Sequence, residues 1–408
     1  MQRSSSNPRY NRSSPAPAGD EHARPEPAHP ASSRPAAPWA ERVVRRLAAS
    51  AGLEIGGPEP WDLQVHDGRF FGRVLRDGSL GLGESYMDGW WDAERLDETF
   101  YRLVGSDARR AVRTPTVLFS SLAAALVNKG RPSRAYDVGH RHYDLGNDLF
   151  EAMLDRRMVY TCGYWHEAAT LDAAQEAKLD LVCRKLGLRE GDRVLDVGCG
   201  WGSFLAFASE RYGAHGVGVT VSEEQVALAR ERLQGLHVEV RLADYRAFED
   251  PVPFDHVVSL GMFEHVDVKN YRMFMRVVRQ HLRDDGLFLL HTIGSNRSVR
   301  TIDPWLERYI FPNSMLPSNR QIGRAIEGLF VMEDWHNFGA HYDRTLMAWY
   351  ERFTRAWPDL RARYDERFRR MWTYYLLQCA GLFRARDAQL WQIVLSKDGV
   401  AGGYTSTR

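Results

Sequence analysis

The chain has 408 residues, with 54 basic and 53 acidic side chains, a formal net charge of +1 and 44% hydrophobic residues. This composition excludes a wholly disordered, collagenous or coiled-coil chain, and the length predicts one large domain with a smaller companion. A nearly neutral chain gives no reason to expect a nucleic-acid partner. The longest apolar runs, such as residues 257–263, are far shorter than the roughly 20 residues of a membrane-spanning helix. We therefore expect a folded protein that can lie on a bilayer but does not cross it.

The first 38 residues hold eight of the 18 prolines among Ser, Ala and Arg. They cannot bury enough apolar area to offset their chain entropy, so residues 1–38 are predicted to form a disordered tail. The opening MQRSSSNPRY lacks the apolar core of a secretion signal, and a cytoplasmic protein is expected. The four cysteines have no short spacing typical of a zinc or redox site, which predicts reduced thiols and no metal centre.

Residues 39–134 predict a small, mainly helical domain. The stretch 41–51, ERVVRRLAASA, is amphipathic, and glycine and proline soon follow it. Residues 115–127, PTVLFSSLAAALV, predict an apolar helix between clusters of arginine and lysine. Packing within the protein and contact with lipid both explain that apolar face.

After residue 191, short β-rich runs alternate with amphipathic helices. The predicted strands are residues 193–197, 216–221, 237–242, 254–260 and 286–292, and the predicted helices are residues 203–212, 222–233 and 270–282. This alternation is typical of a doubly wound α/β fold with a parallel sheet, in which ligands bind beyond the carboxyl ends of the strands.

The segment VLDVGCGWGSF places Gly198, Gly200 and Gly202 between a strand and a helix. Glycines let the backbone approach a ligand closely, and the helix directs its amide dipoles toward it. The spacing differs from the G-x-G-x-x-G of dinucleotide sites, and no acidic residue ends the next strand at Thr220, so a dinucleotide is disfavoured. Together with Asp196, the loop resembles the binding loop of S-adenosylmethionine-dependent methyltransferases. A plain strand-to-helix turn is the alternative.

Longer motifs extend this resemblance to nearly all of residues 40–396, and the chain resembles the cyclopropane-fatty-acyl-phospholipid synthases. The matching segments are residues 78–91, 142–154, 160–165, 194–202, 218–225, 261–266, 289–294, 309–313, 332–339, 342–353 and 379–392. The resemblance implies a seven-stranded, mostly parallel, Rossmann-like methyltransferase sheet with a smaller, mainly helical amino-terminal domain. It also implies a lipid-associating domain at residues 39–134, a catalytic domain at residues 135–400 and a flexible tail at residues 401–408.

The chemistry of such an enzyme places strong demands on a protein. The double bond of an unsaturated phospholipid acyl chain is a weak nucleophile, so it needs the activated methyl of S-adenosylmethionine. The carbocation that forms must be kept from water, and aromatic faces can stabilise it. A base must then remove a proton so that the cyclopropane ring closes. The resemblance further implies a homodimer that associates peripherally with the membrane.

The resemblance assigns the base to a bound bicarbonate ion held by Cys162, Glu264, His291, Ile293 and Tyr342. His291, Tyr342 and backbone amides can donate hydrogen bonds to that ion, and Glu264 can accept its hydroxyl proton. Cys162 would position the anion and would not act as a covalent nucleophile.

Simpler interpretations of these residues stay open. Cys162 alone is typical of a small buried hydrophobic residue, and a lone histidine such as His291 at the end of an apolar strand is usually a core residue. His336 or His341 could replace His291 as the donor. His265, the neighbour of the candidate glutamate, is expected to be structural.

The resemblance also assigns the contacts to S-adenosylmethionine. They are Tyr160, Thr161, Asp196, Gly198, Gly200, Trp201, Gly202, Thr220, Gln225, Asp244, Tyr245 and Arg246. Ser222 and Gln225 also match an S-x-x-Q capping box, which explains both residues without a ligand. Tyr245 and Arg246 depart from an aromatic-acidic pair in shorter mycolic-acid-modifying relatives, so Asp244 is an alternative adenine contact.

Two other functions compete with cyclopropane formation. The same carbocation could yield a methyl-branched acyl chain, or the protein could bind cofactor and lipid without turnover. Retention of all five positions assigned to bicarbonate favours the ring.

Overall fold

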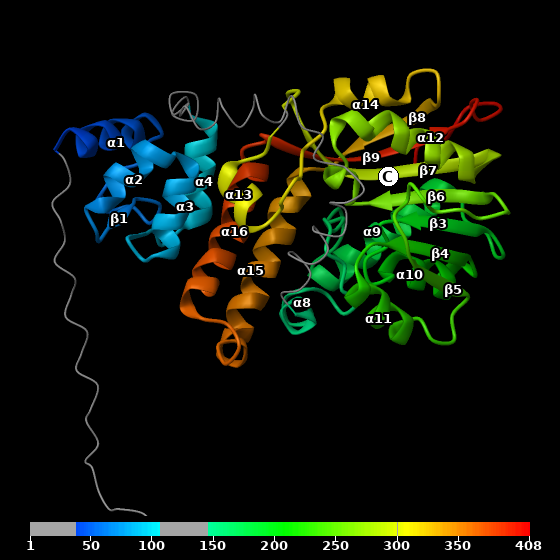
Figure 1. Cartoon of the computed structure of the whole chain (residues 1–408), viewed down its shortest axis with the longest axis horizontal. Coiled ribbons are helices and arrows are strands. Elements are labelled where there is room, and N and C mark those ends of the chain that lie inside the picture. Colours follow the sequence, from blue (N-terminus) through cyan, green and yellow to red (C-terminus); the bar gives the residue numbers. More distant parts are fainter. Residues whose placement is uncertain (1–37, 107–145, 300) are drawn as a thin grey trace, which may run out of the picture. The chain divides into compact units, whose positions relative to one another are not determined.

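The computed structural model describes residues 38–106, 146–299 and 301–408 (Figure 1). The predicted amino-terminal tail, apart from residue 38, and the predicted apolar helix at residues 115–127 lie outside the described residues. Within the described ranges, none of the helices is both long and apolar enough to cross a bilayer.

Residues 38–106 are mainly helical, as predicted. They form α1 (Pro38–Ser50), α2 (Arg69–Asp77), α3 (Ser79–Met87), α4 (Leu96–Gly105) and a short antiparallel pair, β1 (Gln64–Val65) with β2 (Trp91–Asp92). The predicted amphipathic stretch 41–51 coincides with α1 up to Ser50, and Ala40, Val44 and Ala48 are buried in this helix at a spacing of four. This spacing places them on one face of the helix.

The larger region is built around a seven-stranded sheet (Figure 1). Its strands are β3 (Arg193–Val197), β4 (His215–Thr220), β5 (Val238–Leu242), β6 (Phe254–Leu260), β7 (Leu282–Ser295), β8 (Val331–Asn337) and β9 (Ala388–Ser396). Their order in the sheet is β5-β4-β3-β6-β7-β9-β8; the first five are parallel, and β9 runs antiparallel to both of its neighbours. The predicted mostly parallel sheet is therefore confirmed.

Helices cover both faces of this sheet, and a separate hydrophobic cluster lies on each side. On one side are α9 (Leu171–Leu186), α10 (Ser203–Tyr212) and α11 (Glu223–Arg232), and on the other are α12 (Tyr271–His281) and α14 (Asn319–Ile326). Val194 belongs to the first cluster and Leu195 to the second, as alternation along a strand requires. The sheet is thus buried on both faces, which accounts for its nearly continuous apolar strands.

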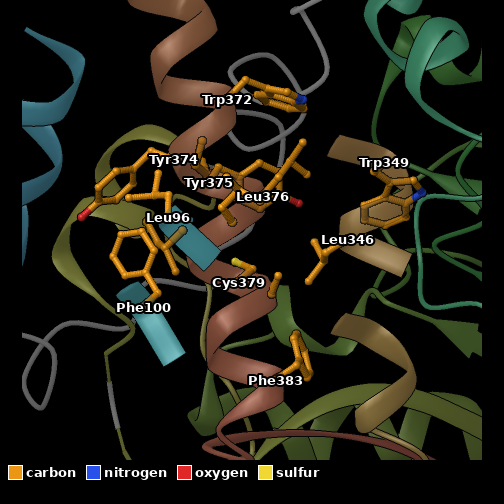
Figure 2. Packing of buried hydrophobic residues seen from close by; sticks show 14 of the residues in the cluster. Leu96, Phe100, Leu346, Trp349, Trp372, Tyr374, Tyr375, Leu376, Cys379 and Phe383 are labelled. Atoms are coloured by element: carbon orange, nitrogen blue, oxygen red, sulfur yellow. The ribbon is translucent and has the colours of Figure 1, made fainter. Parts of the chain in front are cut away.

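The remaining helices are α8 (Asn147–Met153), α13 (Pro304–Tyr309), α15 (Ala340–Leu360) and α16 (Glu366–Arg384), with the short 3₁₀ helices η2 (Phe263–His265) and η3 (Val268–Asn270). Figure 2 shows Phe100 of α4 beside Tyr374 of α16, and the two rings meet edge to face with centroids 4.9 Å apart. The ring of Trp305 also contacts Tyr374, with 4.4 Å between the two ring centroids. Much of the aromatic content of the chain thus packs in this core.

Ion pairs join residues 38–106 to the carboxyl-terminal helices. Arg384 of α16 pairs with Asp97 at 2.8 Å and with Asp343 of α15 at 2.9 Å. The arginine-rich stretch 361–372 pairs largely within the protein, since Arg367 contacts Asp88 and Arg370 contacts Asp92. These two arginines are therefore engaged in ion pairs within the protein.

The expected flexible tail at residues 401–408 makes contacts of its own. The guanidinium of Arg408 forms an ion pair with Asp334 of β8 at 2.6 Å, and the Ser406 hydroxyl donates to the same carboxylate at 3.0 Å. The Tyr404 hydroxyl donates to the carbonyl of Lys185 at 2.9 Å.

Gly381 marks the close approach of α16 to α4. A Cβ at this position would lie 2.7 Å from the Cβ of Phe100 and 2.8 Å from the carbonyl oxygen of Asp97. We expect Gly381→Ala to lower the free energy of unfolding by about 1–3 kcal/mol, because backbone atoms cannot yield to the added methyl.

Gly323→Ala is the matched control, since Gly323 also lies inside a helix and an added Cβ there meets nothing within 4 Å. This change should raise the free energy of unfolding by about 0.4–1 kcal/mol. Thermal unfolding of both variants measures the difference, and equal effects would contradict the close helix contact.

Candidate active site

A cavity of about 220 Å³ lies at the carboxyl ends of β3, β4 and β6, where this fold type binds ligands. Eleven of the twelve predicted cofactor contacts line it. They are Tyr160, Thr161, Asp196, Gly198, Gly200, Trp201, Thr220, Gln225, Asp244, Tyr245 and Arg246. Gly202 is not among the lining residues.

The glycine-rich loop forms one wall of the cavity through backbone conformations that favour glycine. Gly198 has φ +89°, and a Cβ there would lie 2.5 Å from the Cβ of Met262. Gly202 has φ +78° and precedes α10, where a Cβ would lie 2.7 Å from a methyl of Leu233. Gly198 therefore lets the loop pack against Met262, another residue of the cavity wall, whereas Gly202 lets it pack against Leu233 at the end of α11.

Asp196 is the acidic residue of this wall. One oxygen of its carboxylate, Oδ1, is buried and has no hydrogen-bond partner within the described part of the chain. Burial raises its pKa to about 7, and the charge of Lys178 acts in the opposite direction. Such a group is available to a donor on a ligand.

Thr220 and Gln225 meet across the turn that follows β4. The Thr220 hydroxyl donates to Gln225 Oε1 at 2.7 Å, while the Ser222 hydroxyl accepts from the Gln225 backbone amide at 3.3 Å. The serine thus caps α11 as the pattern predicts, but the glutamine side chain bonds to Thr220 and lines the cavity.

At another part of the cavity wall, Asp244 and Arg246 form a close ion pair. The backbone amide of Arg246 also donates to Asp244 Oδ1 at 2.9 Å. The ring of Tyr245 contacts Phe274 at 5.2 Å between centroids. All three predicted adenine contacts therefore border the cavity, and a guanidinium already engages the Asp244 carboxylate.

The five residues assigned to bicarbonate do not line this cavity. Glu264, on η2, accepts a hydrogen bond from the backbone amide of Ile293 at 2.6 Å through Oε1. Its second oxygen, Oε2, is buried and finds no hydrogen-bond partner among the described residues. Burial raises the pKa of Glu264 to about 7, so this carboxyl titrates near neutrality.

His291 lies on β7 and is buried. Its Nδ1 faces the side-chain nitrogen of Gln392 on β9 at 3.3 Å. In this orientation of the Gln392 amide, Nδ1 accepts and Nε2 carries the hydrogen. Burial holds the pKa of His291 well below its usual value, and Nε2 has no partner in the described ranges. His291 therefore presents a neutral, unused donor.

Cys162 and Tyr342 complete the predicted set. Burial raises the pKa of the Cys162 thiol, and the Thr345 hydroxyl lies 3.8 Å from its sulfur. Burial also raises the pKa of Tyr342, and the charge of an ionised Glu264 reinforces that shift. The thiol is thus neutral. A neutral thiol is consistent with a positioning role, whereas a nucleophilic role would require the thiolate.

The alternative histidines are engaged elsewhere. Nδ1 of His336 lies 3.1 Å from Nζ of Lys185, and Nδ1 of His341 accepts from the backbone amide of Trp165 at 3.0 Å. His265 lines the cofactor cavity, and its Nδ1 lies 2.9 Å from the Ser314 hydroxyl.

An aromatic wall connects the two sites. The ring of Trp349 on α15 lies 5.2 Å from Tyr160, which lines the cavity, and 6.0 Å from Tyr342. Trp349 is fully buried. Such π-faces can stabilise a cation without reacting with it.

Sequence reasoning missed several residues of the cavity wall, notably Lys178, Met262 and Asn313. Lys178 left a signal. It lies on α9 in the spacing of the buried Leu171, Ala174 and Gln175, where an apolar side chain is normally expected. A lysine in such a stripe is typical of a functional or paired charge.

Comparisons with known proteins agree with this geometry. A family model described as mycolic acid cyclopropane synthetase matches residues 131–393. The cyclopropane-fatty-acyl-phospholipid synthase of Escherichia coli K12 is 52% identical over 370 residues, which cover 90% of this chain and 96% of the relative. A probable fatty acid methyltransferase of Pseudomonas putida is 33% identical over 85% of this chain and 90% of the relative.

Solved structures are also similar. The cyclopropane synthase MmaA2 of Mycobacterium tuberculosis has a TM-score of 0.60 and 30% identity, and the match covers 64% of this chain and 98% of that chain. Mycolic acid cyclopropane synthase CmaA1, complexed with SAH and CTAB, has a TM-score of 0.59 at 30% identity, with the same coverage of both chains. Taken with the geometry, these matches show that the chain belongs to the mycolic acid cyclopropane synthetase family and is an enzyme of the methyltransferase class that includes the cyclopropane-fatty-acyl-phospholipid synthases.

Proposed function

We propose that this enzyme transfers a methylene group from S-adenosylmethionine to the cis double bond of an unsaturated phospholipid acyl chain, and that bicarbonate is the base. Family membership makes it an S-adenosylmethionine-dependent enzyme that acts on lipids. The observation that carries the finer proposal is the pair of buried, unused polar atoms, Glu264 Oε2 and His291 Nε2, both without partners in the described residues.

The cofactor cavity suits S-adenosylmethionine. Bound there, this group supplies an activated methyl, the electrophile that an alkene without an acidic proton requires. Gly198 belongs to the loop that lines this cavity, and Thr220 and Gln225, which follow β4, add polar groups to its wall. The relative CmaA1 was solved with SAH, which supports the same cofactor here.

The polar groups of the five residues assigned to bicarbonate suit a small anion with one hydroxyl group. Bicarbonate would supply a base beside the thiol and the phenol, which burial keeps protonated, and beside the neutral imidazole, whose Nε2 would donate a hydrogen bond. Nε2 of His291 would donate to the anion, and Glu264 Oε2 would accept its hydroxyl proton. Cys162, Ile293 and Tyr342 would enclose it.

Water exclusion is the second requirement of the chemistry. Alkylation leaves a positive charge on the acyl chain, and a nearby water molecule would trap it. Cys162, Tyr342 and Trp349 are all less than a tenth exposed. Buried and mostly aromatic side chains thus lie between the cavity and the residues assigned to bicarbonate, which would favour ring closure over hydration.

We further propose that residues 39–134 associate with lipid, that residues 135–400 form the catalytic domain, and that the enzyme acts in the cytoplasm as a homodimer at the membrane surface. Because the chain has almost no net charge, it has little overall electrostatic attraction to an anionic bilayer. A separate lipid-binding region at residues 39–134 would bring the acyl chains to the catalytic domain.

Liposomes of a monounsaturated phospholipid, incubated with the protein and labelled S-adenosylmethionine, test the function. We expect labelled fatty acids that are 14 daltons heavier and resist hydrogenation, because ring closure consumes the double bond. A branched saturated chain would instead identify a fatty acid methyltransferase, and an unchanged lipid would refute turnover.

Glu264→Gln tests the buried carboxylate. We expect turnover to fall by about 100-fold or more, because an amide cannot accept the anion's proton in the same way. The affinity for S-adenosylhomocysteine should stay within a factor of about two, because Glu264 does not line the cofactor cavity.

The matched control for this variant is Glu239→Gln, since Glu239 is exposed on the edge strand β5 and pairs with the half-buried Arg241. Calorimetry and the liposome assay should find it close to wild type. If Glu264→Gln instead loses cofactor binding in step with turnover, the carboxylate belongs to the nucleotide site.

Removal of bicarbonate tests the base directly. In buffers purged of carbon dioxide, we expect turnover to fall and to recover on addition of bicarbonate, while cofactor binding stays constant. Turnover that is insensitive to bicarbonate, with trace carbonate excluded, would assign the base to the protein.

A further inference from the structure

Lys178 is a buried charge that the proposed mechanism leaves without a role. It lies on α9, is 1% exposed, and lines the cofactor cavity. Its Nζ donates to the Thr161 hydroxyl at 2.9 Å. Within the described ranges, no carboxylate lies within ion-pair distance of this ammonium, although burial of an unpaired charge is costly.

A second buried lysine on the same helix differs from Lys178 because it has an ion-pair partner within the protein. Lys185 follows Lys178 by two turns, its side chain is fully buried, and its Nζ lies 3.6 Å from a carboxylate oxygen of Asp334. Burial lowers the pKa of each lysine to about 8, yet only Lys185 has its anion within the protein. A direct ion-pair partner for Lys178 would therefore have to come from a ligand.

The charges of Asp155 and Asp196 raise the pKa of Lys178 and so partly oppose the effect of burial, but neither carboxylate forms an ion pair with Nζ in the described part of the chain. Both oxygens of Asp155 accept backbone amides, from Val159 at 2.8 Å and Arg157 at 2.9 Å. Asp196 keeps Oδ1 without a partner in the described part of the chain. The cavity wall thus presents a cation at Lys178 and a separate acceptor at Asp196.

The amino-acid end of S-adenosylmethionine is a zwitterion, with one carboxylate and one ammonium. We propose that Lys178 binds the carboxylate of the cofactor's methionine end, while Asp196 faces its ammonium. This inference rests on the proposed cofactor and adds a residue that neither the motif nor the resemblance assigns.

The position of Lys178 agrees with the geometry that the reaction requires. Its Nζ donates to Thr161, which directly precedes Cys162 in the chain, so the ammonium lies on the side of the cavity next to the residues proposed for bicarbonate. The methionine end of the cofactor is bonded to the sulfur that carries the reactive methyl. It must therefore lie at this end of the cavity, and its carboxylate would separate the lysine from the positively charged sulfur.

Thr161 helps to fix the lysine. Its methyl packs toward Gly261, where a Cβ would lie 2.6 Å from Thr161 Cγ2, and its hydroxyl oxygen accepts from Lys178. Since a hydroxyl oxygen that accepts can still donate, Thr161 keeps a proton for the same carboxylate.

The test pairs two ligands with two variants. S-adenosylhomocysteine carries the carboxylate, and its decarboxylated analogue, S-adenosyl-3-thiopropylamine, lacks only that group. Binding of each is measured by calorimetry to the wild-type chain, Lys178→Met and the control Lys185→Met. We expect Lys178→Met to weaken S-adenosylhomocysteine by about 10-fold to 100-fold and to change the analogue by less than threefold.

The wild-type chain should itself prefer S-adenosylhomocysteine over the analogue by about tenfold or more, which keeps the test decisive if Lys178→Met fails to fold. Lys185→Met should leave both affinities unchanged. Thermal unfolding without ligand adds a second readout: Lys178→Met should keep or raise Tm because it removes an unpaired charge, whereas Lys185→Met should lower it.

Three results would overturn the assignment of Lys178. They are equal weakening of both ligands by Lys178→Met, equal affinity of the wild-type chain for both ligands, and a loss of Tm as large as in Lys185→Met. Failure of the wild-type chain to bind S-adenosylhomocysteine at all would instead refute the proposed cofactor, and the two failures are thus distinguishable.

Discussion

The constraint on which this structure depends is the desolvation of a few ionisable side chains. Asp196, Lys178, Glu264 and His291 are each almost fully buried, and burial shifts every one of them toward its neutral form. A site of this kind costs stability, because unused polar atoms are removed from water. The two hydrophobic clusters on either face of the sheet supply the rigid surroundings that hold such groups in place.

The fold could be predicted where local pattern decides the structure. The five β-rich runs became the five parallel strands β3 to β7, and the predicted helix 203–212 coincides with α10. In contrast, the place of β9 between β7 and β8 depends on pairing between distant segments. All residues of β9 are buried, so the strand has no alternation of polar and apolar side chains from which its place in the sheet could be predicted.

The residues that line the cavity could be picked out from the sequence because many of them follow strand ends in short, recognisable segments. Asp196 and Gly198 come from one such segment, and Thr220 comes from the next. Lys178 was missed because a lysine on a helix usually lies at the surface, and its burial depends on how α9 packs on the sheet. The roles of Glu264 and His291 came from the resemblance alone, and their unpartnered atoms became visible only in three dimensions.

The insertion of β9 into the interior of the sheet has a consequence for synthesis. Gln392, which orients the imidazole of His291, lies on this strand, and β9 also bridges β7 to β8. The first five strands all precede β9 in the chain, and the cavity lies at the carboxyl ends of three of them. The cavity wall is thus built from segments made earlier than Gln392, whereas the orientation of His291 depends on the later pairing of β7 with β9.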